Sequence, residues 1–291
     1  MRPRWLILSL HDMPLKKLYP LTNPRRIATA PTFSELTKHR PEKALLVIRR
    51  RSGGRNNQGK ITVRHRGGGA KRYTRRVDFR MERLDSPAIV RAIEYDPNRG
   101  ARLALVEYAD KEKRYIIAPD GLAVGQSVVS SRRALPEFSV GSRTALEYIP
   151  VGTMVHNVEI TPGRGGVLVR GAGNATQLLS LDGPWAQLKL PSSEVRLLSK
   201  NCAASIGAVS NPDHSLRKFG SAGIRRHLGW RPSVRGKAMN PVDHPHGGGE
   251  GKHPIGMKHP KTPWGKNAFG VKTRNRKKYS NRMILQRRQR K

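Results

Sequence analysis

The sequence predicts a mainly β protein in which two small, adjacent β-barrels are flanked by two basic arms. Short apolar runs bounded by turn residues recur between residues 75 and 199, as expected for β-meanders. No helical periodicity of ten or more residues separates these runs, which argues against an α/β domain. The hydrophobic fraction of 36% fits a folded body that is smaller than the whole 291-residue chain.

Charge separates the arms from the body. Residues 1–83 hold 22 basic and 5 acidic residues, residues 84–200 hold 14 and 12, and residues 201–291 hold 21 and 3. The net charge is +37, and no acidic residue occurs from Gly251 onward. A solvated protein surface mixes both signs, so arms of a single sign predict a polyanionic partner. Cys202 is the only cysteine, which excludes an internal disulfide framework.

The first twelve residues need a separate interpretation. They combine arginines with the apolar run 5–8, which is too short to span a bilayer. A signal peptide has a longer apolar core, and a transit peptide lacks acids, whereas Asp12 interrupts this stretch. We therefore expect a non-targeting extension, with Met13 as an alternative start.

Residues 54–60 match the beginning of a phosphate-binding loop, GxxxxGK. That loop needs Ser or Thr at the next position and a helix after it, but Ile61 stands there and residues 61–64 are predicted to form a strand. Nucleotide hydrolysis is therefore disfavoured. The same polar residues suit nucleic-acid phosphates, because they offer many donors beside a glycine backbone.

A second glycine-rich segment, residues 64–73, surrounds a triple glycine with five basic residues and ends on Tyr73. Glycine lets the main chain approach a polyanion closely, arginine pairs with phosphates, and tyrosine can stack on a base. The alternative interpretation is a flexible linker, which the density of basic residues disfavours.

Two series of strands are predicted in the nearly neutral middle. The first comprises residues 75–79, 88–95, 102–108 and 113–118, and the second comprises residues 144–149, 154–160, 166–170, 175–181, 185–190 and 194–199. Helix is scarce. Asn211 is predicted to cap a short helix that begins at Pro212, and residues 222–228 are predicted to form one or two turns.

Residues 239–251 predict a shaped loop. Pro241 and Pro245 fix their own φ angles, while three successive glycines allow backbone conformations that residues with a side chain avoid. The segment has little apolar surface to bury, so we expect a partner outside the chain to order it.

His244 and His246 admit three interpretations, which we rank as RNA contact, a structural role and catalysis. A metal site is weakly supported, because Cys202 is the only thiol and a proline between the histidines makes joint chelation awkward. Catalysis would use Asp243 as orienter and His244 as base. Adjacency in sequence is a poor guide to that geometry, and no nucleophile is marked.

Several of these motifs together closely resemble the ribosomal protein L2 family. The matching segments are residues 52–65, 94–99, 149–152, 155–159 and 235–251, within a resemblance that covers roughly residues 14–291. The chain departs from the family pattern in its first twelve residues and at Ala70, where a histidine is usual. The resemblance implies an OB-fold barrel followed by an SH3-like barrel, flanked by long basic extensions with little regular structure.

Four parts follow from the resemblance: a basic N-terminal extension (1–71), an OB-fold RNA-binding barrel (72–136), an SH3-like barrel (137–203) and a basic C-terminal extension (204–291). The implied function is that of a structural constituent of the large ribosomal subunit. Such a protein binds ribosomal RNA as a primary binder and supports subunit association, tRNA binding and organisation of the peptidyl-transferase centre. It is not expected to be an enzyme, because RNA carries the chemistry of the ribosome.

The resemblance also implies roles for single residues. Arg99 and Arg170 correspond to two arginines implicated in RNA binding, and His244 to a histidine discussed for peptidyl transfer, where it and Asp243 would at most have a supporting role. The full set of predicted RNA-binding residues is Arg55, Asn56, Asn57, Lys60, Arg64, His65, Arg66, Lys71, Arg72, Arg99, Arg170, Arg231, Arg235, Asn240, His244 and His246.

The expected partners are large-subunit ribosomal RNA, other ribosomal proteins and the small subunit at the subunit bridge, with no membrane and no small-molecule substrate. No cofactor or protein-bound metal is expected, and Mg²⁺ would be associated with the RNA. The expected location is the ribosome of a bacterial cytoplasm, with a mitochondrial or plastid ribosome as the alternative. Rival functions are a general DNA- or RNA-binding architectural protein and, less favoured, a nucleotide- or metal-dependent hydrolase.

Overall fold

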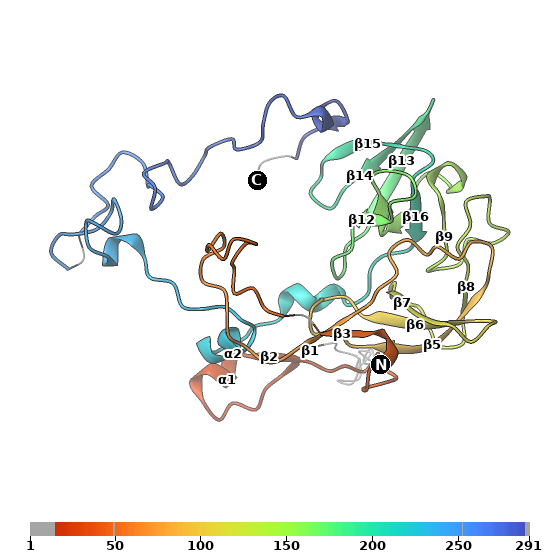
Figure 1. Ribbon diagram of the computed structural model, residues 1–291, viewed down its shortest axis with the longest axis horizontal. Helices are drawn as coiled ribbons and strands as arrows, with labels where there is room; N and C mark the ends of the chain where they lie inside the picture. The colour runs from red at the N-terminus through yellow and green to blue at the C-terminus, as the bar shows by residue number, and fades with distance from the viewer. Residues whose placement is uncertain (1–14, 49, 252, 289–291) are drawn as a thin grey trace, which may run out of the picture. The chain divides into compact units, whose positions relative to one another are not determined.

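The chain divides into two compact units in the computed structural model, which describes residues 15–48, 50–251 and 253–288 (Figure 1). Unit 1 contains the described residues up to 50, residues 71–221 and the described residues from 282 onward. Unit 2 contains residues 51–70 and 222–281. Each unit therefore combines segments that are distant in sequence. The extension expected over residues 1–12 lies outside the described residues.

The first barrel of unit 1 is built on a four-stranded antiparallel sheet in the order β7-β6-β5-β8. Its strands are β5 (Ala88–Glu94), β6 (Leu103–Tyr108), β7 (Lys113–Ile117) and β8 (Ser127–Val128). Side chains of β5 alternate between buried and more exposed positions, because successive residues of a strand point to opposite faces. Val90, Val106 and Ile116 pack in one core, which confirms the meander predicted over this region.

A two-stranded sheet pairs β3 (Leu46–Ile48) with β4 (Tyr73–Arg75) in the same unit. The strand predicted over residues 75–79 is thus displaced toward the N-terminus. Residues after β4 leave the ladder, although an isolated bridge still joins Val77 to Tyr115 of β7.

The second barrel is built on a seven-stranded antiparallel sheet in the order β17-β15-β14-β13-β10-β16-β9. The strands are β9 (Arg143–Ala145), β10 (Met154–His156), β13 (Thr176–Asp182), β14 (Trp185–Lys189), β15 (Val195–Ser199), β16 (Ala203–Ile206) and β17 (Ile284–Gln286). A separate ribbon pairs β11 (Val158–Glu159) with β12 (Gly166–Leu168). Leu146, Val155, Leu178 and Leu188 lie in the core between these strands. The mainly β class is confirmed, and the barrel-like sheets are consistent with an OB-fold barrel followed by an SH3-like barrel.

Arg143, in β9, forms a buried ion pair with Glu159 of β11 inside the second barrel. Its side chain is 1% exposed, and its Nη2 lies 3.0 Å from Oε1 of Glu159. Its Nη1 donates to the Asn157 oxygen at 2.8 Å. Its main chain pairs with Val129 and Ser131, which follow β8 of the first barrel. Removing either charge would leave the other buried without its counter-charge, so the pair stabilises the second barrel, whereas the main-chain bonds of Arg143 connect it to the first.

The last strand, β17, lies at the edge of the seven-stranded sheet. Gln286 pairs with Val195 of β15, and the N–H of Leu197 donates to the Met283 oxygen at 2.8 Å. The sequence did not predict this strand. The C-terminal extension, which leaves unit 1 after residue 221, therefore returns to it at residue 282.

Only two short α-helices occur in the described residues, α1 (Asn23–Ile27) and α2 (Ala222–His227). Helix α2 confirms the turns predicted over residues 222–228. Helix α1 lies between β1 (Leu15–Lys17) and β2 (Thr29–Pro31), which pair with each other, and none of these three elements was predicted. Short 3₁₀ turns complete the structure at η1 (Lys43–Leu45), η2 (Leu146–Tyr148), η4 (Gly236–Ala238) and η5 (Tyr279–Asn281).

The helix predicted to begin at Pro212 is a 3₁₀ helix, η3 (Pro212–Leu216), and Asn211 stands at its N-cap position as predicted. Asn211 has a positive φ of 63° and makes no side-chain capping bond. Its Nδ2 instead donates to the Gly100 oxygen at 2.6 Å, which fixes the start of η3 against the first barrel.

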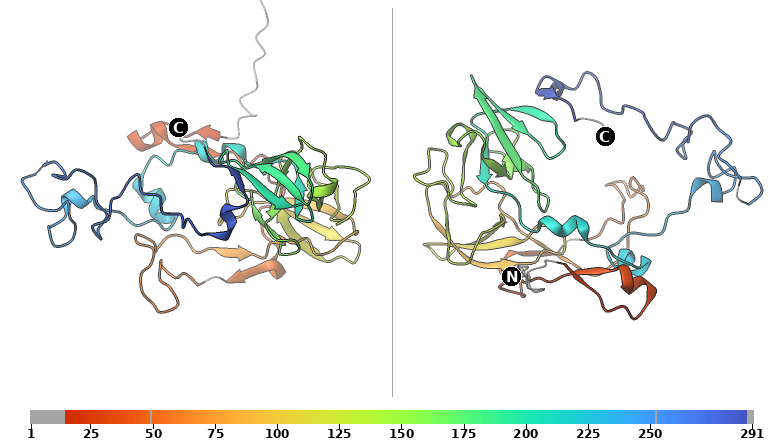
Figure 2. Two further views of the ribbon diagram at one scale, coloured as in Figure 1. Left: turned by 90° about the horizontal axis from the view of Figure 1, so that it is seen from above. Right: turned by 180° about the vertical axis from the view of Figure 1, so that it is seen from behind.

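Unit 2 consists largely of turns and irregular chain (Figure 2). The strand predicted over residues 61–64 is wrong, because these residues bend after one isolated bridge at Ile61. The N–H groups of Thr62 and Val63 both donate to the Gly54 oxygen, at 2.9 and 3.0 Å. The chain therefore wraps around Gly54, where φ is +81° and a Cβ would lie 2.1 Å from the Val63 oxygen.

The division into four parts stays a prediction. The boundary expected at residue 203 falls on the first residue of β16, which belongs to the sheet of the second barrel. Both barrels lie in unit 1, and the basic extensions contribute residues to both units.

Candidate nucleic-acid interface

Arg99 is held by the turn that follows β5. The N–H of Arg99 donates to the Asp96 oxygen at 3.2 Å, and the N–H of Asn98 donates to Oδ1 of Asp96 at 2.9 Å. Asp96 is fully buried, and its Oδ2 pairs with Nη1 of Arg99. The other carboxylate oxygen lies 3.8 Å from Nη1 of Arg75. A buried carboxylate with two arginine partners keeps Arg99 at a fixed place on the surface.

Phe79 brings Arg99 and Arg170 together. The Cζ atom of Arg170 lies 4.5 Å from the centroid of the Phe79 ring, and that of Arg99 lies 5.5 Å from it. Both distances suit cation–π contact. Burial lowers the pKa of Arg170 below its usual value, and the neighbouring Arg99 lowers it further. Phe79, Arg99 and Arg170, which we call the Phe79 cluster, thus hold two like charges side by side.

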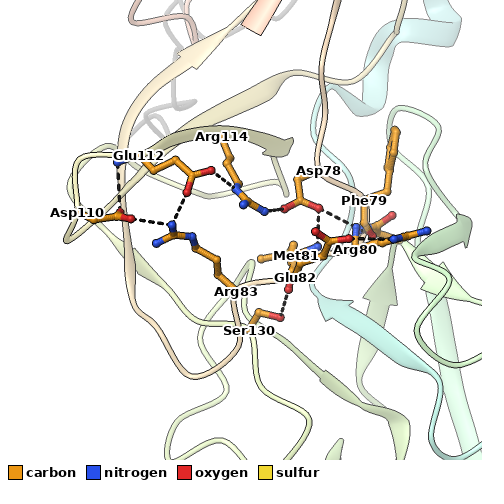
Figure 3. Close-up of polar contacts among 11 residues, drawn as sticks. Asp78, Phe79, Arg80, Met81, Glu82, Arg83, Asp110, Glu112, Arg114 and Ser130 are labelled. Atoms are coloured by element: carbon orange, nitrogen blue, oxygen red, sulfur yellow. Dashed lines mark hydrogen bonds and ion pairs between the residues drawn. The ribbon is translucent and has the colours of Figure 1, made fainter. Parts of the chain in front are cut away.

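The backbone around Phe79 is fixed by a network of ion pairs (Figure 3). Asp78 accepts the N–H groups of Arg80 and Met81 at 3.0 and 2.7 Å, and Nη1 of Arg114 at 2.8 Å. The Phe79 oxygen accepts the N–H of Gly166, at the start of β12, at 2.9 Å. The main chain at Phe79 is therefore held to β12 and, through Asp78, to Arg114 of β7, while the first barrel supplies Arg99 and the second Arg170.

The same network continues to the hairpin between β6 and β7 (Figure 3). Nε of Arg114 donates to Oε1 of Glu112 at 2.8 Å, and Arg83 pairs with both Glu112 and Asp110, the latter at 2.6 Å. The side-chain contact with Arg83 lowers the pKa of Asp110. Arg83 and Arg114 are thereby neutralised within the protein, as Arg99 is by Asp96, whereas Arg170 forms no ion pair in the described residues.

Lys71 and Arg72 lie beside the turn that holds Arg99. Nη1 of Arg72 donates to the Pro97 oxygen at 2.9 Å, and Nζ of Lys71 lies 5.8 Å from the centroid of the Tyr73 ring. Asn98 binds the Tyr73 oxygen through its Nδ2 at 2.8 Å. The structure therefore brings three predicted site residues of unit 1 onto neighbouring segments.

In unit 2, Asn56 shapes the first glycine-rich loop. Its Oδ1 accepts the N–H groups of Gln58 and Lys60, both at 3.0 Å, and its own N–H donates to the Lys60 oxygen at 2.9 Å. The side-chain oxygen of Asn56 is thus engaged in hydrogen bonds within the loop. Asn57 and the Lys60 side chain are exposed on it.

The second glycine-rich loop is paired with the segment after α2. Gly67 donates its N–H to the Gly229 oxygen at 3.1 Å, and His65 contacts the Pro232 oxygen through Nδ1 at 2.9 Å. The guanidinium of Arg66 lies 3.4 Å from the centroid of the Trp230 ring. The two basic segments, far apart in sequence, therefore form one surface within unit 2.

Two consecutive turns form the histidine loop, which we define as residues 239–251. The N–H of Asp243 donates to the Asn240 oxygen at 3.0 Å, and the N–H of Gly247 donates to the His244 oxygen at 2.8 Å. Pro241 and Pro245 stand at the second position of these turns, where a fixed φ is favourable. The prolines therefore shape the loop as expected.

The rings of His244 and His246 are buried inside this loop, with centroids 4.7 Å apart. Nδ1 of His244 accepts the N–H of His246 at 3.0 Å, and Nε2 of His246 accepts the N–H of Lys261 at 2.7 Å. Burial and the neighbouring His244 lower the pKa of His246. Both rings thus serve as hydrogen-bond acceptors for main chain, and RNA contact by either ring stays a prediction.

The remaining predicted residues, Arg55, Arg64, Arg231, Arg235 and Asn240, are exposed in unit 2. The sequence did not single out Phe79 or Trp230, because the arginines that contact them come from segments distant in sequence, and no local pattern marks such contacts. The described residues contain no group of three or more His, Cys, Asp or Glu side chains that could hold a metal ion. Within the same residues, no helix has the length and apolar character to span a membrane.

Comparison with protein families agrees with this arrangement. Residues 42–130 match the model of the Ribosomal Proteins L2, RNA binding N-terminal domain, and residues 139–265 match that of the Ribosomal Proteins L2, C-terminal domain. Together the matched segments include the Phe79 cluster, the histidine loop and both barrels. Of the barrel strands, only β17 lies outside them. The chain therefore belongs to the ribosomal protein L2 family, which has a structural, RNA-binding role in the large ribosomal subunit.

Proposed function

We propose that the chain binds large-subunit ribosomal RNA through the Phe79 cluster of unit 1 and the basic loops of unit 2. In this role it organises RNA near the peptidyl-transferase centre and supports tRNA binding and subunit association. The observation that carries the proposal is the placement of Arg99 and Arg170 against one ring. Two guanidinium groups held side by side repel each other, and a phosphate between them would relieve that repulsion.

Electrostatics favours a heavily phosphorylated partner over a small molecule. Arg170 forms no ion pair within the described part of the chain, and Arg99 shares a single buried carboxylate. The arms add a large excess of cations in unit 2. Neutralising phosphates releases counterions, so six to ten such contacts would make affinity fall by about 10³ to 10⁵ between 50 and 200 mM salt.

The contribution of His244 to peptidyl transfer is, in this proposal, one of position. Its Nδ1 already accepts a main-chain N–H, and its neighbour Asp243 contributes a main-chain bond to the same turn. A general base needs a free acceptor within reach of the substrate proton. We therefore assign His244 and Asp243 to shaping the loop, and the chemistry to RNA.

Binding to transcribed large-subunit RNA, measured at several fixed salt concentrations with duplex DNA as competitor, tests the proposal. We expect strong preference for the ribosomal RNA and a steep salt dependence. Equal competition by duplex DNA would instead support a general nucleic-acid binder. ATP turnover or bound metal in RNA-free protein would support the hydrolase alternative.

Reconstituted subunits test the role near the peptidyl-transferase centre. We expect His244→Ala to reduce peptide-bond formation more than assembly, because the histidine loop loses an internal acceptor while the barrels stay intact. Subunits with full RNA content and normal peptide-bond formation would contradict this role. We further propose a bacterial-type ribosome as the location, which sedimentation of the chain with large subunits from bacterial, mitochondrial and plastid extracts would test.

A further inference from the structure

Residues 260–268 form a compact hairpin that the sequence did not predict. The N–H of Thr262 donates to the Lys266 oxygen at 2.7 Å, and an antiparallel bridge joins the two sides. The N–H of Gly265 closes the turn onto the Thr262 oxygen at 2.9 Å. Pro263 occupies the second position of that turn, where its fixed φ is favourable. Main-chain bonds and proline thus give the tip a defined shape.

Trp264 stands at the tip of this hairpin and is 74% exposed. The described residues provide no ring contact or cation contact to its indole. Lys261 and Lys266 flank it, and no acidic residue follows Gly251. An indole exposes a large apolar area to water unless a partner covers it. A partner for this tip must therefore combine a flat apolar face with negative charge.

The hairpin is fixed to the histidine loop. The N–H of Lys261 donates to Nε2 of His246 at 2.7 Å, and the N–H of His246 donates to Nδ1 of His244 at 3.0 Å. Gly236 lies against the same ring, since a Cβ there would come within 2.5 Å of His244. The two buried rings thus support the hairpin and hold it, together with Trp264, in one orientation.

We propose that Trp264 is a stacking platform for an unpaired nucleobase of RNA, with Lys266 beside the phosphate of that nucleotide. The proposal rests on the proposed RNA-binding function and assigns a new contact within it. Aromatic side chains among cations are the usual means of binding unpaired bases. A membrane surface would require several apolar side chains on one face, whereas this tip offers a single ring between lysines.

Affinity measurements on the full-length, RNA-free chain with transcribed large-subunit RNA test the stacking contact. We expect Trp264→Leu to lower the affinity about 5- to 100-fold at fixed salt, without changing the slope of affinity against salt. Trp264→Phe should retain most of the affinity, because it keeps a ring. Lys266→Gln should instead reduce the slope of log affinity against log salt by about one, because it removes one phosphate contact.

Tyr148→Leu is the matched control. Tyr148 is a 40% exposed aromatic residue in η2 of the second barrel, next to Glu147 and away from any basic run. Its substitution should leave the affinity unchanged. An equal loss from Tyr148→Leu and Trp264→Leu would overturn the assignment, because the effect would then not depend on the hairpin.

Base-specific chemical probing of the same complexes locates the contact. Wild-type protein should protect a few unpaired bases that become reactive with Trp264→Leu, while backbone protections elsewhere persist. Unchanged affinity and unchanged base protection with Trp264→Leu would overturn the stacking site and leave the RNA-binding function standing. If the wild-type chain showed no preference for ribosomal RNA, the proposed function would fail, and the stacking site with it.

The anchoring by His246 has its own test. His246→Ala removes the acceptor for the Lys261 N–H, so it should lower affinity in the same direction as Trp264→Leu. The double variant should then lose little more than either single variant, because both act through one hairpin. Fully additive losses would show that the histidine loop does not position Trp264.

Discussion

Arg99 and Arg170 place their guanidinium groups against the same ring, that of Phe79, although Arg99 follows a strand of the first barrel and Arg170 a strand of the second. The main-chain oxygen of Phe79 in turn accepts the N–H of Gly166 in β12. A change in how the barrels meet would therefore separate the two cations. The cluster couples the packing of unit 1 to the geometry of a phosphate site.

Substituting either arginine should weaken RNA binding while leaving the barrels folded. We expect Arg99→Ala and Arg170→Ala each to reduce the slope of log affinity against log salt by about one, because each removes a phosphate contact. Filter binding at controlled salt measures this. Arg91→Ala is the matched control, since Arg91 already pairs with Glu107 at 3.0 Å on the first barrel.

Phe79→Leu adds a test of positioning, because it removes no charge. Phe79→Leu should lower the affinity for RNA and leave the slope of log affinity against log salt at its wild-type value. Phe79→Tyr should keep the wild-type affinity. Arginine variants with unchanged affinity would remove the Phe79 cluster from the RNA interface.

Arg143→Ala should destabilise unit 1 strongly. The substitution leaves Glu159 buried without its cation, and loss of one partner from a buried ion pair costs about 3 to 5 kcal/mol. The free energy of unfolding from urea denaturation measures the effect. Arg91→Ala, which breaks an exposed pair, should cost at most about 1 kcal/mol. Similar losses from the two variants would show that the buried Arg143–Glu159 pair stabilises the protein no more than the exposed pair does.

Acid should destabilise the second barrel through His156. Burial lowers its pKa to about 4, with a smaller contribution from Arg143, while its bond to the Gly207 oxygen acts in the opposite direction. The folded protein therefore favours the neutral ring. Its stabilising effect is complete above about pH 6.5 and is lost as the pH falls toward 4.

Between pH 7 and pH 4, the wild-type chain should lose about 3 kcal/mol more unfolding free energy than His156→Gln. Urea unfolding at both pH values gives the difference, in which the shared titration of other groups cancels. Equal losses in the two proteins would mean that His156 titrates normally.

Gly54 and Gly59 form a matched pair for the loop of unit 2. Both have a positive φ, of +81° and +77°, but only at Gly54 would a Cβ meet main chain, the Val63 oxygen at 2.1 Å. Gly59→Ala should cost about 1 to 2 kcal/mol from the left-handed conformation alone. Gly54→Ala should in addition displace the chain around it.

Amide hydrogen exchange at Thr62 and Val63 measures this displacement of the chain around residue 54, because both amides donate to the Gly54 oxygen. We expect these amides to lose protection in Gly54→Ala and to keep it in Gly59→Ala. Retained protection in both variants would contradict the tight packing around Gly54.

Local sequence patterns were sufficient to predict strands in which apolar residues alternate with polar ones or form a continuous run. The alternation along β5 and the apolar runs of β6 and β7 predicted the first barrel, and turn residues at 96–98 placed Arg99 on a turn. The charge distribution and the motifs predicted the RNA-binding family. Each of these signals is contained in a short stretch of sequence.

Long-range pairing was not predictable in the same way. β17 is a three-residue strand whose partner lies in β15, and Phe79 acquires its two arginines only when the barrels pack. Residues 61–64 have strand-like side chains, but hydrogen bonds to Gly54 bend them. The sequence favoured RNA contact by His244 and His246, and only the structure shows that one ring nitrogen of each accepts a main-chain N–H.

The pairing of β17 with β15 gives the long basic extension the topology of a closed loop. As long as the Gln286–Val195 pair persists, residues 222–281 have no free end on the C-terminal side. A closed loop cannot be threaded through a ring of folded RNA. RNA that encircles this segment must therefore close around it after the loop is in place, or β17 must first leave the sheet. Only in the second case would release of β17 have to precede the encirclement by RNA.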